Sequence, residues 1–428
     1  MTTPAAPTPD RHAAVAIVRI LRDAGHVAYF AGGCVRDELL GVTPEDYDVA
    51  TDATPDRVVT LFPKSGEVGK SFGVVIVKHG GPVVEVATFR ADGLYTDRRR
   101  PDSVRFSTPA EDAARRDFTV NALFLDPLGA EGGVQSSLGG TVIDLVGGLK
   151  DLSTKILRAV GDPAKRLAED HLRALRAARL AAKLGFVIEA GTAEAIRAHA
   201  TDLRGVSRER VGEEVRRMVS HPTRARAAQF VRDLGLAGPV FMQTNELSGS
   251  RAGTPHLAAL GPRASVGTYL AGWAMDLGEV VEGDAARAEL CARWRRALCL
   301  SNDEHEAMRA VLRLVAGLRD DWRRLGVAGR KRLAAQPCFA DALCLFGVEK
   351  PVMATEIAAD VASLASTRSG LAPTPWVTGD DLVAMGKTPG PEFKRILDAV
   401  YDAQLEDRIV TPEEGRELAR RLGVQSAE

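Results

Sequence analysis

Residues 32–37 read GGCVRD, and residues 46–48 read DYD. Two glycines between a predicted strand and a predicted helix let backbone N–H groups approach a phosphate closely, and Arg36 is placed to add a charge-assisted contact. Asp46 and Asp48 are two apart on a predicted strand, so both carboxylates point to one face. A divalent cation relieves the repulsion within such a pair, and Mg²⁺ prefers oxygen ligands. The two motifs predict a metal-dependent phosphate site.

Two further polar groups follow along the chain. Residues 84–90 read VEVATFR, and Glu85 stands in an otherwise apolar strand. Because a buried, unpaired carboxylate is costly, we expect Glu85 to join the aspartate pair as a third carboxylate near the metal. Residues 115–121 read RRDFTVN, and their three kinds of polar group suit a ribose and a triphosphate.

A fourth group, EDHLR at residues 169–173, opens a helix that we expect over Ala168–Leu184. Asp170 and Arg173 would neighbour each other on one face of that helix, which Arg176 and Arg179 extend. By spacing alone, this pattern is typical of an i,i+3 salt bridge on a solvated face.

The pattern of apolar and polar residues changes along the chain. Between residues 26 and 152, short β-rich runs alternate with Gly-rich and Asp-rich turns, which predicts a small α/β domain with a mixed sheet. The expected strands are Val27–Phe30, Tyr47–Ala50, Val74–Val77, Val83–Thr88 and Phe118–Leu125. From Pro163 onward the sequence predicts helices alone, most clearly at Ala168–Leu184, Thr192–His199, Arg208–Met218 and Arg224–Leu234. The predicted division is an N-terminal tail and helix (1–25), a head (26–152), a neck (153–234), a body (235–365) and a tail (366–428).

Composition sets bounds on the class of protein. The 428 residues carry a net charge of −1, so no global field attracts nucleic acid. Arginine outnumbers lysine by 45 to 11, which suits phosphate recognition and is equally typical of a GC-rich genome. Five cysteines without CxxC spacing predict a reducing, cytoplasmic setting and no zinc site. The N-terminus has no signal-peptide pattern, and no run of 18 apolar residues predicts a membrane span.

Taken together, these residues resemble the class II tRNA nucleotidyltransferase and bacterial poly(A) polymerase family, within the DNA polymerase β-like superfamily. The matching segments are residues 32–51, 84–90, 92–101, 115–121 and 166–186, with TGDDL at 378–382, Gly386, Pro389 and Gly390 near the C-terminus. Residues 235–365 carry no such motif. The resemblance implies an α/β nucleotidyltransferase head with a mixed sheet, followed by an all-α neck, body and tail.

The resemblance also implies roles for the residues above. Asp46 and Asp48 would hold two Mg²⁺ ions, and Glu85 would lie near the attacking 3′-hydroxyl. The implied nucleotide-binding residues are Gly32, Gly33 and Arg36 at the triphosphate, Arg116, Asp117 and Asn121 at the ribose and phosphates, Asp170 and Arg173 at the base, and Arg176 and Arg179 on the same helix.

Base reading by Asp170 and Arg173 has a physical basis. Cytosine and adenine each present an exocyclic amine beside a ring-nitrogen acceptor, so a carboxylate accepts from the amine and a guanidinium donates to the ring. Uracil and guanine present a carbonyl and an N–H instead, and the unpaired groups are penalised. Leu167 and Leu180 stand where the family often has Phe, and His171 where it often has Pro; we expect these helix-packing sites to leave the chemistry unaffected.

The implied activity is addition of C and A to the 3′ end of tRNA from CTP and ATP. Residues 92–101 resemble the flexible loop that lets one pocket switch from CTP to ATP, which argues against an enzyme that adds only C. A poly(A) polymerase and a partial A-adding enzyme remain open: VGKSF at 68–72 favours a polymerase, whereas the lysine-free, acidic segment 401–428 favours tRNA. A non-catalytic RNA-binding protein on an inactive scaffold is the alternative from another class, and the intact Asp46, Asp48 and Glu85 disfavour it.

Overall fold

The computed structural model describes residues 8–66, 73–92, 104–129, 134–243, 253–279, 283–320 and 322–424. The chain forms two compact units, residues 1–218 with 226–244, and residues 219–225 with 245–428. Two segments named above, 68–72 and 93–101, lie outside the described residues. Their predicted roles therefore stay predictions, as does the finer division into head, neck, body and tail.

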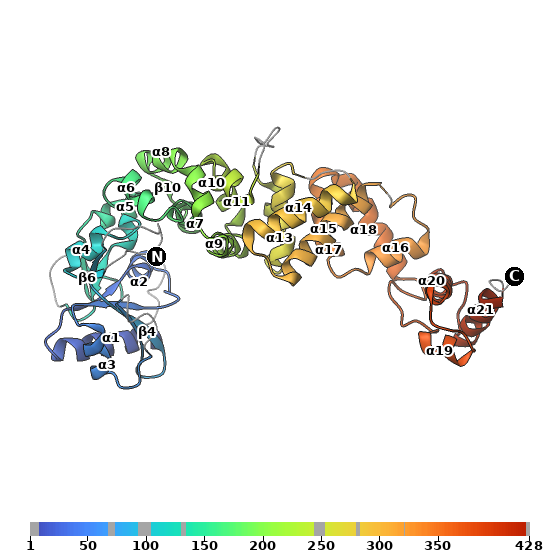
Figure 1. Cartoon of the computed structure of the whole chain (residues 1–428), viewed down its shortest axis with the longest axis horizontal. Helices are drawn as coiled ribbons and strands as arrows, with labels where there is room; N and C mark the ends of the chain where they lie inside the picture. Colours follow the sequence, from blue (N-terminus) through green and yellow to red (C-terminus); the bar gives the residue numbers. More distant parts are fainter. Residues whose placement is uncertain are drawn as a thin grey trace. The chain divides into compact units, whose positions relative to one another are not determined.

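A six-stranded mixed sheet lies in the blue to cyan part of the first unit (Figure 1). Its order is β3-β4-β2-β1-β7-β8. The β2–β4 pair is parallel, and the other neighbours are antiparallel. The strands of this unit are β1 (Ala28–Ala31), β2 (Asp48–Thr51), β3 (Val74–Lys78), β4 (Val83–Thr88), β5 (Arg90–Asp92), β6 (Val104–Phe106), β7 (Phe124–Asp126), β8 (Thr141–Ile143), β9 (Ile156–Leu157) and β10 (Val187–Ile188).

The strand predictions are confirmed where apolar and polar residues alternate clearly. In β4, Val84 and Val86 are buried, and Val83 and Glu85 are exposed, as expected for a strand with one face on the core. The single strand predicted over Phe118–Leu125 is wrong: Thr119–Asn121 forms the 3₁₀ turn η2, and β7 begins at Phe124. Apolar residues are buried both in a strand and in a 3₁₀ turn, so an apolar run alone does not distinguish the two conformations.

Helices cover the sheet and then form the neck. The helices of this unit are α1 (Pro9–Asp23), α2 (Gly33–Leu39), α3 (Pro55–Leu61), α4 (Pro109–Ala114), α5 (Gly148–Thr154), α6 (Pro163–Glu169), α7 (Arg173–Leu184), α8 (Ala190–Ala198), η3 (Ala200–Gly205), α9 (Arg208–Ser220), α10 (Arg224–Asp233) and α11 (Ala237–Phe241). Helices α9 and α10 each have a few residues that belong to the second unit.

Two sequence expectations for the neck are corrected. The single helix over Ala168–Leu184 is two helices, because Asp170 is extended, with φ −152° and ψ 102°, and ends α6. The expectation of helices alone after Pro163 misses β10, which pairs in parallel with β9 over two residues. These two strands are too short to show an alternation in the sequence.

Helices are the only regular secondary structure among the described residues of the second unit. Its helices are α12 (Pro255–Ala259), α13 (Val266–Asp276), α14 (Asp284–Leu298), α15 (Asn302–Asp320), α16 (Val327–Ala334), α17 (Phe339–Glu349), α18 (Pro351–Ala365), α19 (Gly379–Ala384), α20 (Pro391–Leu405) and α21 (Pro412–Val424). Trp273 of α13 and Trp294 of α14 are fully buried in its core. No helix within the described ranges is both long enough and apolar enough to cross a membrane.

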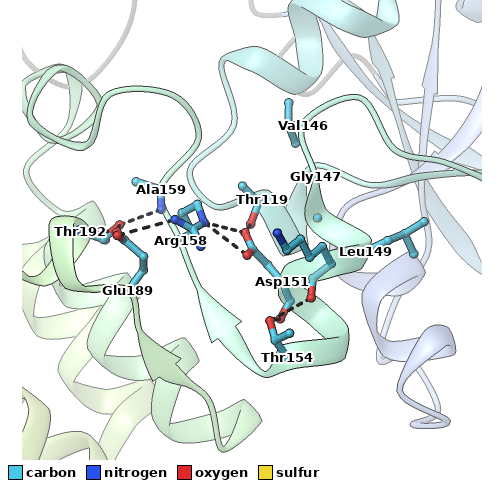
Figure 2. Close-up of polar contacts among 12 residues, drawn as sticks. Thr119, Val146, Gly147, Leu149, Asp151, Thr154, Arg158, Ala159, Glu189 and Thr192 are labelled. Carbon is cyan, nitrogen blue, oxygen red and sulfur yellow. Dashed lines mark hydrogen bonds and ion pairs between the residues drawn. The ribbon is translucent and has the colours of Figure 1, made fainter.

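A polar cluster lies behind η2 (Figure 2). Thr119 donates its hydroxyl to Asp151 at 2.7 Å, and Arg158 donates to the same carboxylate at 3.1 Å. Arg158 also lies 3.6 Å from Glu189, which precedes α8. The cluster therefore ties the 3₁₀ turn of the head to the first helices of the neck, and nothing in the sequence analysis anticipated it.

Close packing behind η2 predicts a sensitive glycine. A Cβ at Gly148 would lie 2.3 Å from the Thr119 carbonyl oxygen and 3.0 Å from the Leu123 side chain. Because that oxygen is backbone, Gly148→Ala should lower the free energy of unfolding by about 1–3 kcal/mol through overpacking. Urea unfolding followed by circular dichroism measures the change. Gly205→Ala is the control, since no atom lies within 4 Å of its Cβ; equal effects of the two variants would contradict the prediction.

Candidate active site

The glycine turn before α2 forms one wall of the site. Gly32 has φ +81°, which favours glycine, and a Cβ there would lie 3.0 Å from Arg116 Nη1. Arg36 is buried on α2, where it donates to Asp37 at 2.7 Å and to the Asn121 side-chain oxygen. The turn therefore places backbone N–H groups of α2 beside a fixed guanidinium, as the motif predicted.

The two aspartates flank a buried tyrosine. Strand β2 begins at Asp48, so Asp46 precedes the strand instead of lying within it. Asp46 is exposed, Asp48 is half-buried, and Tyr47 between them is 2% exposed. Both carboxylates therefore lie away from the core, although only Asp48 is within the strand predicted for the pair.

The surroundings of Asp48 raise the pKa of its carboxyl group. Burial raises the pKa of Asp48 to about 7, with further contributions from the charges of Asp46 and Glu85, while Arg116 opposes the shift. Asp48 and Glu85 are register partners on the parallel strands β2 and β4. A divalent cation at this point would neutralise charges that otherwise destabilise one another.

Glu85 is exposed and lies on β4, facing Asp48. Among the described residues, no three His, Cys, Asp or Glu side chains form a group that could hold a metal ion by themselves. The donor set still fits Mg²⁺, which is usually held by one or two carboxylates together with substrate phosphates instead of by an all-protein cage. Asp46 and Asp48 are therefore the candidate ligands, and the metal role of Glu85 stays a prediction.

The segment after α4 carries three predicted nucleotide contacts. Arg116 binds the buried Asp112 at 3.0 Å and donates to the Asn121 carbonyl oxygen at 3.1 Å. The Asn121 side chain in turn donates to Asp117 at 3.2 Å. Asp117 also accepts from Arg176 of α7, at 2.8 and 3.0 Å. These contacts join the head to the neck across the site.

Asp170 and Arg173 are not paired with each other, so the expectation that they neighbour one another on one helical face is wrong. Asp170 lies in the break between α6 and α7 and binds Arg210 of α9 through both oxygens, at 2.6 and 3.3 Å. Arg173 is the first residue of α7 and binds Glu169 at 2.5 Å. The simple i,i+3 salt bridge is excluded, and each side chain is held by a different partner.

One cavity of about 610 Å³ collects these groups. This volume lies within the range of small-ligand sites. All the predicted site residues line it except Glu85: Gly32, Gly33, Arg36, Asp46, Asp48, Arg116, Asp117, Asn121, Asp170, Arg173, Arg176 and Arg179. Seven arginines and four aspartates are among its lining residues, so the cavity suits an anionic ligand.

Four lining residues were not among the predicted site: Arg115, Leu172, Leu180 and Arg210. Arg115 stands in the RRDFTVN motif, so the motif itself offered a signal. Leu180 was expected to be a packing site; it is buried and also reaches the cavity wall. Arg210 lies on another helix, 40 positions after Asp170, and no local pattern connects the two.

The mixed sheet, with the acidic pair at the start of β2 beside the glycine turn of α2, defines a DNA polymerase β-like nucleotidyltransferase fold. Residues 28–158 match the family model of the poly(A) polymerase head domain, and residues 185–247 match that of a probable RNA and SrmB-binding site of polymerase A. Over these two stretches the chain is similar to poly(A) polymerases and to the class II tRNA nucleotidyltransferases.

Several known proteins resemble the chain. A CCA-adding enzyme of Geobacillus thermodenitrificans is 42% identical over 225 residues, which cover 52% of this chain and 53% of that protein. One of Bacillus pumilus is 45% identical over 207 residues, 48% of this chain and 49% of that protein. The chain thus matches about half the length of these relatives. The crystal structure of the Bacillus stearothermophilus CCA-adding enzyme in complex with CTP has a TM-score of 0.75 at 28% identity, covering 98% of this chain and 99% of that chain.

The pair formed by Asp117 and Arg176 predicts a pH effect on stability. Burial alone would raise the pKa of Asp117, but the charge and hydrogen bonds of Arg176 and the hydrogen bond from Asn121 outweigh it and lower the pKa to about 2. Because an unpaired aspartate titrates near pH ~3.9, the stabilisation is present above about pH 4 and is lost as the pH falls toward about 2.

Asp117→Asn should therefore lower the free energy of unfolding at pH 7 by on the order of 2 kcal/mol. It should also flatten the acid limb between about pH 4 and 2, because unfolding of the wild type takes up a proton at Asp117 in that range and unfolding of the variant does not. Urea unfolding across that pH range measures both effects. A variant with the wild-type pH dependence would show that the ion pair adds nothing to stability.

Proposed function

We propose that this chain adds C and A to the 3′ end of tRNA from CTP and ATP, by metal-dependent nucleotidyl transfer with two Mg²⁺ ions, in the cytoplasm. The observation that carries the proposal is the single cavity in which a phosphate-binding turn, an acidic pair and two base-reading candidates meet. A site for any phosphate ester would need the phosphate-binding turn and the acidic pair. A site for a nucleotide also needs groups that contact the base, and here the neck supplies the two candidates.

The head handles the triphosphate. The first N–H groups of α2, beginning at Gly33, face the phosphates, while the Gly32 N–H donates to the Leu123 carbonyl oxygen at 3.1 Å. Arg36 and Arg116 add fixed positive charge around the phosphates. Asp46 and Asp48 would hold the metal, which would supply charge neutralisation at the reacting phosphate and activation of the attacking hydroxyl. Glu85 lies beside that pair, on the neighbouring strand, where it faces Asp48.

The neck reads the base. Arg173 would donate to the ring nitrogen of C or A, and Asp170 would accept from the amine. Arg210 fixes the Asp170 carboxylate through two hydrogen bonds, and because each carboxylate oxygen has two lone pairs, acceptor capacity remains for an amine. The incoming nucleotide is thus chosen by protein groups, with no nucleic-acid template.

The relatives favour tRNA over the predicted alternatives. The sequence relatives reported above are CCA-adding enzymes, and a Thermotoga maritima CCA-adding enzyme solved with tRNA shares the fold at 19% identity and a TM-score of 0.64. A poly(A) polymerase would extend generic RNA with ATP alone. A non-catalytic scaffold would have no reason to keep a carboxylate pair at the mouth of a nucleotide-sized, arginine-rich cavity.

The deciding experiment uses three tRNA substrates, ending before CCA, after the first C and after both C residues. Each is incubated with Mg²⁺ and one nucleoside triphosphate at a time. The proposal expects CTP to extend the first two and ATP to extend the third by a single residue. Extension of the third substrate alone would indicate an A-adding enzyme, long A tracts on any RNA would indicate a poly(A) polymerase, and no extension would indicate a binding protein.

Substitution in the acidic pair should lower activity without lowering stability. Asp48→Asn removes a metal ligand, so nucleotide incorporation should fall by about 10³-fold or more, since a bound metal supplies several kcal/mol of charge stabilisation. Because the folded state raises the pKa of Asp48, its ionised form destabilises the fold above neutral pH. The variant should therefore be at least as stable as wild type at pH 8.

Asp52→Asn is the matched control, since Asp52 follows the far end of β2 and accepts from the Val27 backbone outside the cavity. It should keep its activity. Near-normal incorporation by Asp48→Asn would contradict the role of Asp48 as a metal ligand. A loss of activity that is explained by a loss of stability would also contradict it.

Base selection by Asp170 predicts a change of specificity. Asp170→Ala removes the acceptor and leaves Arg173 in place, so discrimination against UTP and GTP should shrink by ~100-fold, within the roughly 10⁴-fold that polar readout can supply. Single-nucleotide incorporation with each triphosphate gives the ratio of kcat/KM values. Asp162→Ala is the control, because Asp162 caps α6 and does not line the cavity. Unchanged preference for CTP and ATP in Asp170→Ala would show that this carboxylate does not read the base.

A further inference from the structure

Glu38 is a buried carboxylate in the head that plays no part in the proposed mechanism. Its side chain is fully buried. Three side chains from separate segments donate to it: Arg11 at 2.8 Å, Tyr47 at 2.8 Å and Ser136 at 2.6 Å. Buried charges are retained when they are paired and hydrogen-bonded, and Glu38 meets both conditions.

The three donors come from different parts of the fold. Arg11 lies on α1 and also donates to the Gly139 carbonyl oxygen at 2.8 Å. Ser136 belongs to the connection between β7 and β8. Tyr47 lies immediately before β2, and Glu38 itself lies on α2. One carboxylate thus holds together the helix of the phosphate-binding turn and the strand of the acidic pair.

Tyr47 is the residue between the two candidate metal ligands. Its hydroxyl is fixed by Glu38, and its ring packs edge-to-face on Phe30 with centroids 5.2 Å apart. Because side chains alternate along extended backbone, fixing Tyr47 on the core side fixes the directions of Asp46 and Asp48 on the other side. No hydrogen bond or ion pair is described for the Asp46 side chain itself, so its position depends on the backbone that Tyr47 anchors.

We propose that Glu38, acting through the hydroxyl of Tyr47, is a positioning residue for the metal-binding pair Asp46 and Asp48. The inference rests on the proposed function for its consequence in catalysis, but metal binding tests it without catalysis. The repulsion between Asp46 and Asp48 pushes the carboxylates apart before a cation binds. The hydrogen bond from Tyr47 to Glu38 holds the intervening residue, so the carboxylates stay in place for the metal.

Two conservative variants separate positioning from general stability. Tyr47→Phe removes the hydroxyl and keeps the ring packing. Ser136→Ala removes another hydroxyl from the same Glu38 carboxylate and leaves Tyr47 untouched. Both leave Glu38 with one donor fewer, so thermal unfolding should show losses of similar size. Their effects on metal binding should differ.

The probe is Mn²⁺ in the presence of CTP, with free Mn²⁺ measured by electron paramagnetic resonance on the folded full-length chain. Tyr47→Phe should weaken Mn²⁺ affinity by about tenfold, the lower end of what loss of a supporting hydrogen bond costs a metal site. It should raise the Mg²⁺ concentration for half-maximal incorporation by the same factor, and kcat should recover at excess Mg²⁺. Ser136→Ala should change both by less than about twofold, because Tyr47 keeps its partner.

Wild-type Mn²⁺ affinity in Tyr47→Phe would overturn the positioning role. So would equal losses of affinity in both variants, since those would follow from a loosened fold alone. The two proposals fail separately. If the wild type extends no RNA while Tyr47→Phe still loses Mn²⁺ affinity, the proposed function fails and the positioning role stands. If the wild type extends tRNA and Tyr47→Phe binds Mn²⁺ normally, the positioning role alone fails.

Discussion

The ion pair between Asp117 and Arg176 is the interaction on which the geometry of the site depends. In the proposed function, the head supplies groups for a triphosphate and α7 supplies groups for a base. The two sets of groups can bind the same nucleotide only if the distance between them is fixed. Asp117 receives two hydrogen bonds from Arg176 and one from Asn121, whose side-chain oxygen accepts from Arg36. An unbroken series of charge-assisted contacts therefore runs from α7 to α2, and such contacts are stronger than neutral ones.

The arrangement also concentrates positive charge at one place in a chain of nearly neutral net charge. Its net charge is −1, yet the cavity gathers seven arginines against four aspartates. Most of those arginines are already held by carboxylates. Arg116 is bound by Asp112, and Arg179 by the buried Glu214. A paired guanidinium has five N–H donors in a fixed fork, so it stays oriented and still has donors for a phosphate. Preorganised donors of this kind need no rearrangement when charge develops in the transition state.

The sequence was a good guide to this site wherever a local rule applied. The alternating spacing predicted that Asp46 and Asp48 both avoid the core, although only Asp48 lies in β2, and the paired glycines predicted the turn before α2. It failed where the outcome depended on distant partners. Asp170 looked like a helical residue beside Arg173, but Arg210 of α9 binds it in an extended break between two helices. Likewise, the role of Glu38 depends on Arg11 and Ser136, 27 and 98 positions away. Motif spacing carries no information on such contacts.

A common principle connects the two ends of the cavity. At the base-reading end, Arg210 holds Asp170 and Glu169 holds Arg173. At the metal end, Glu38 holds Tyr47 and thereby the backbone of the acidic pair. In each case the residue that would contact the nucleotide is oriented by a second residue. In the proposed function no template strand is present, so the protein itself would reject the wrong base, and a site rejects it strongly when its polar groups cannot turn to accommodate the mismatch. On that proposal, the supporting contacts contribute to the selectivity together with the residues that would touch the base.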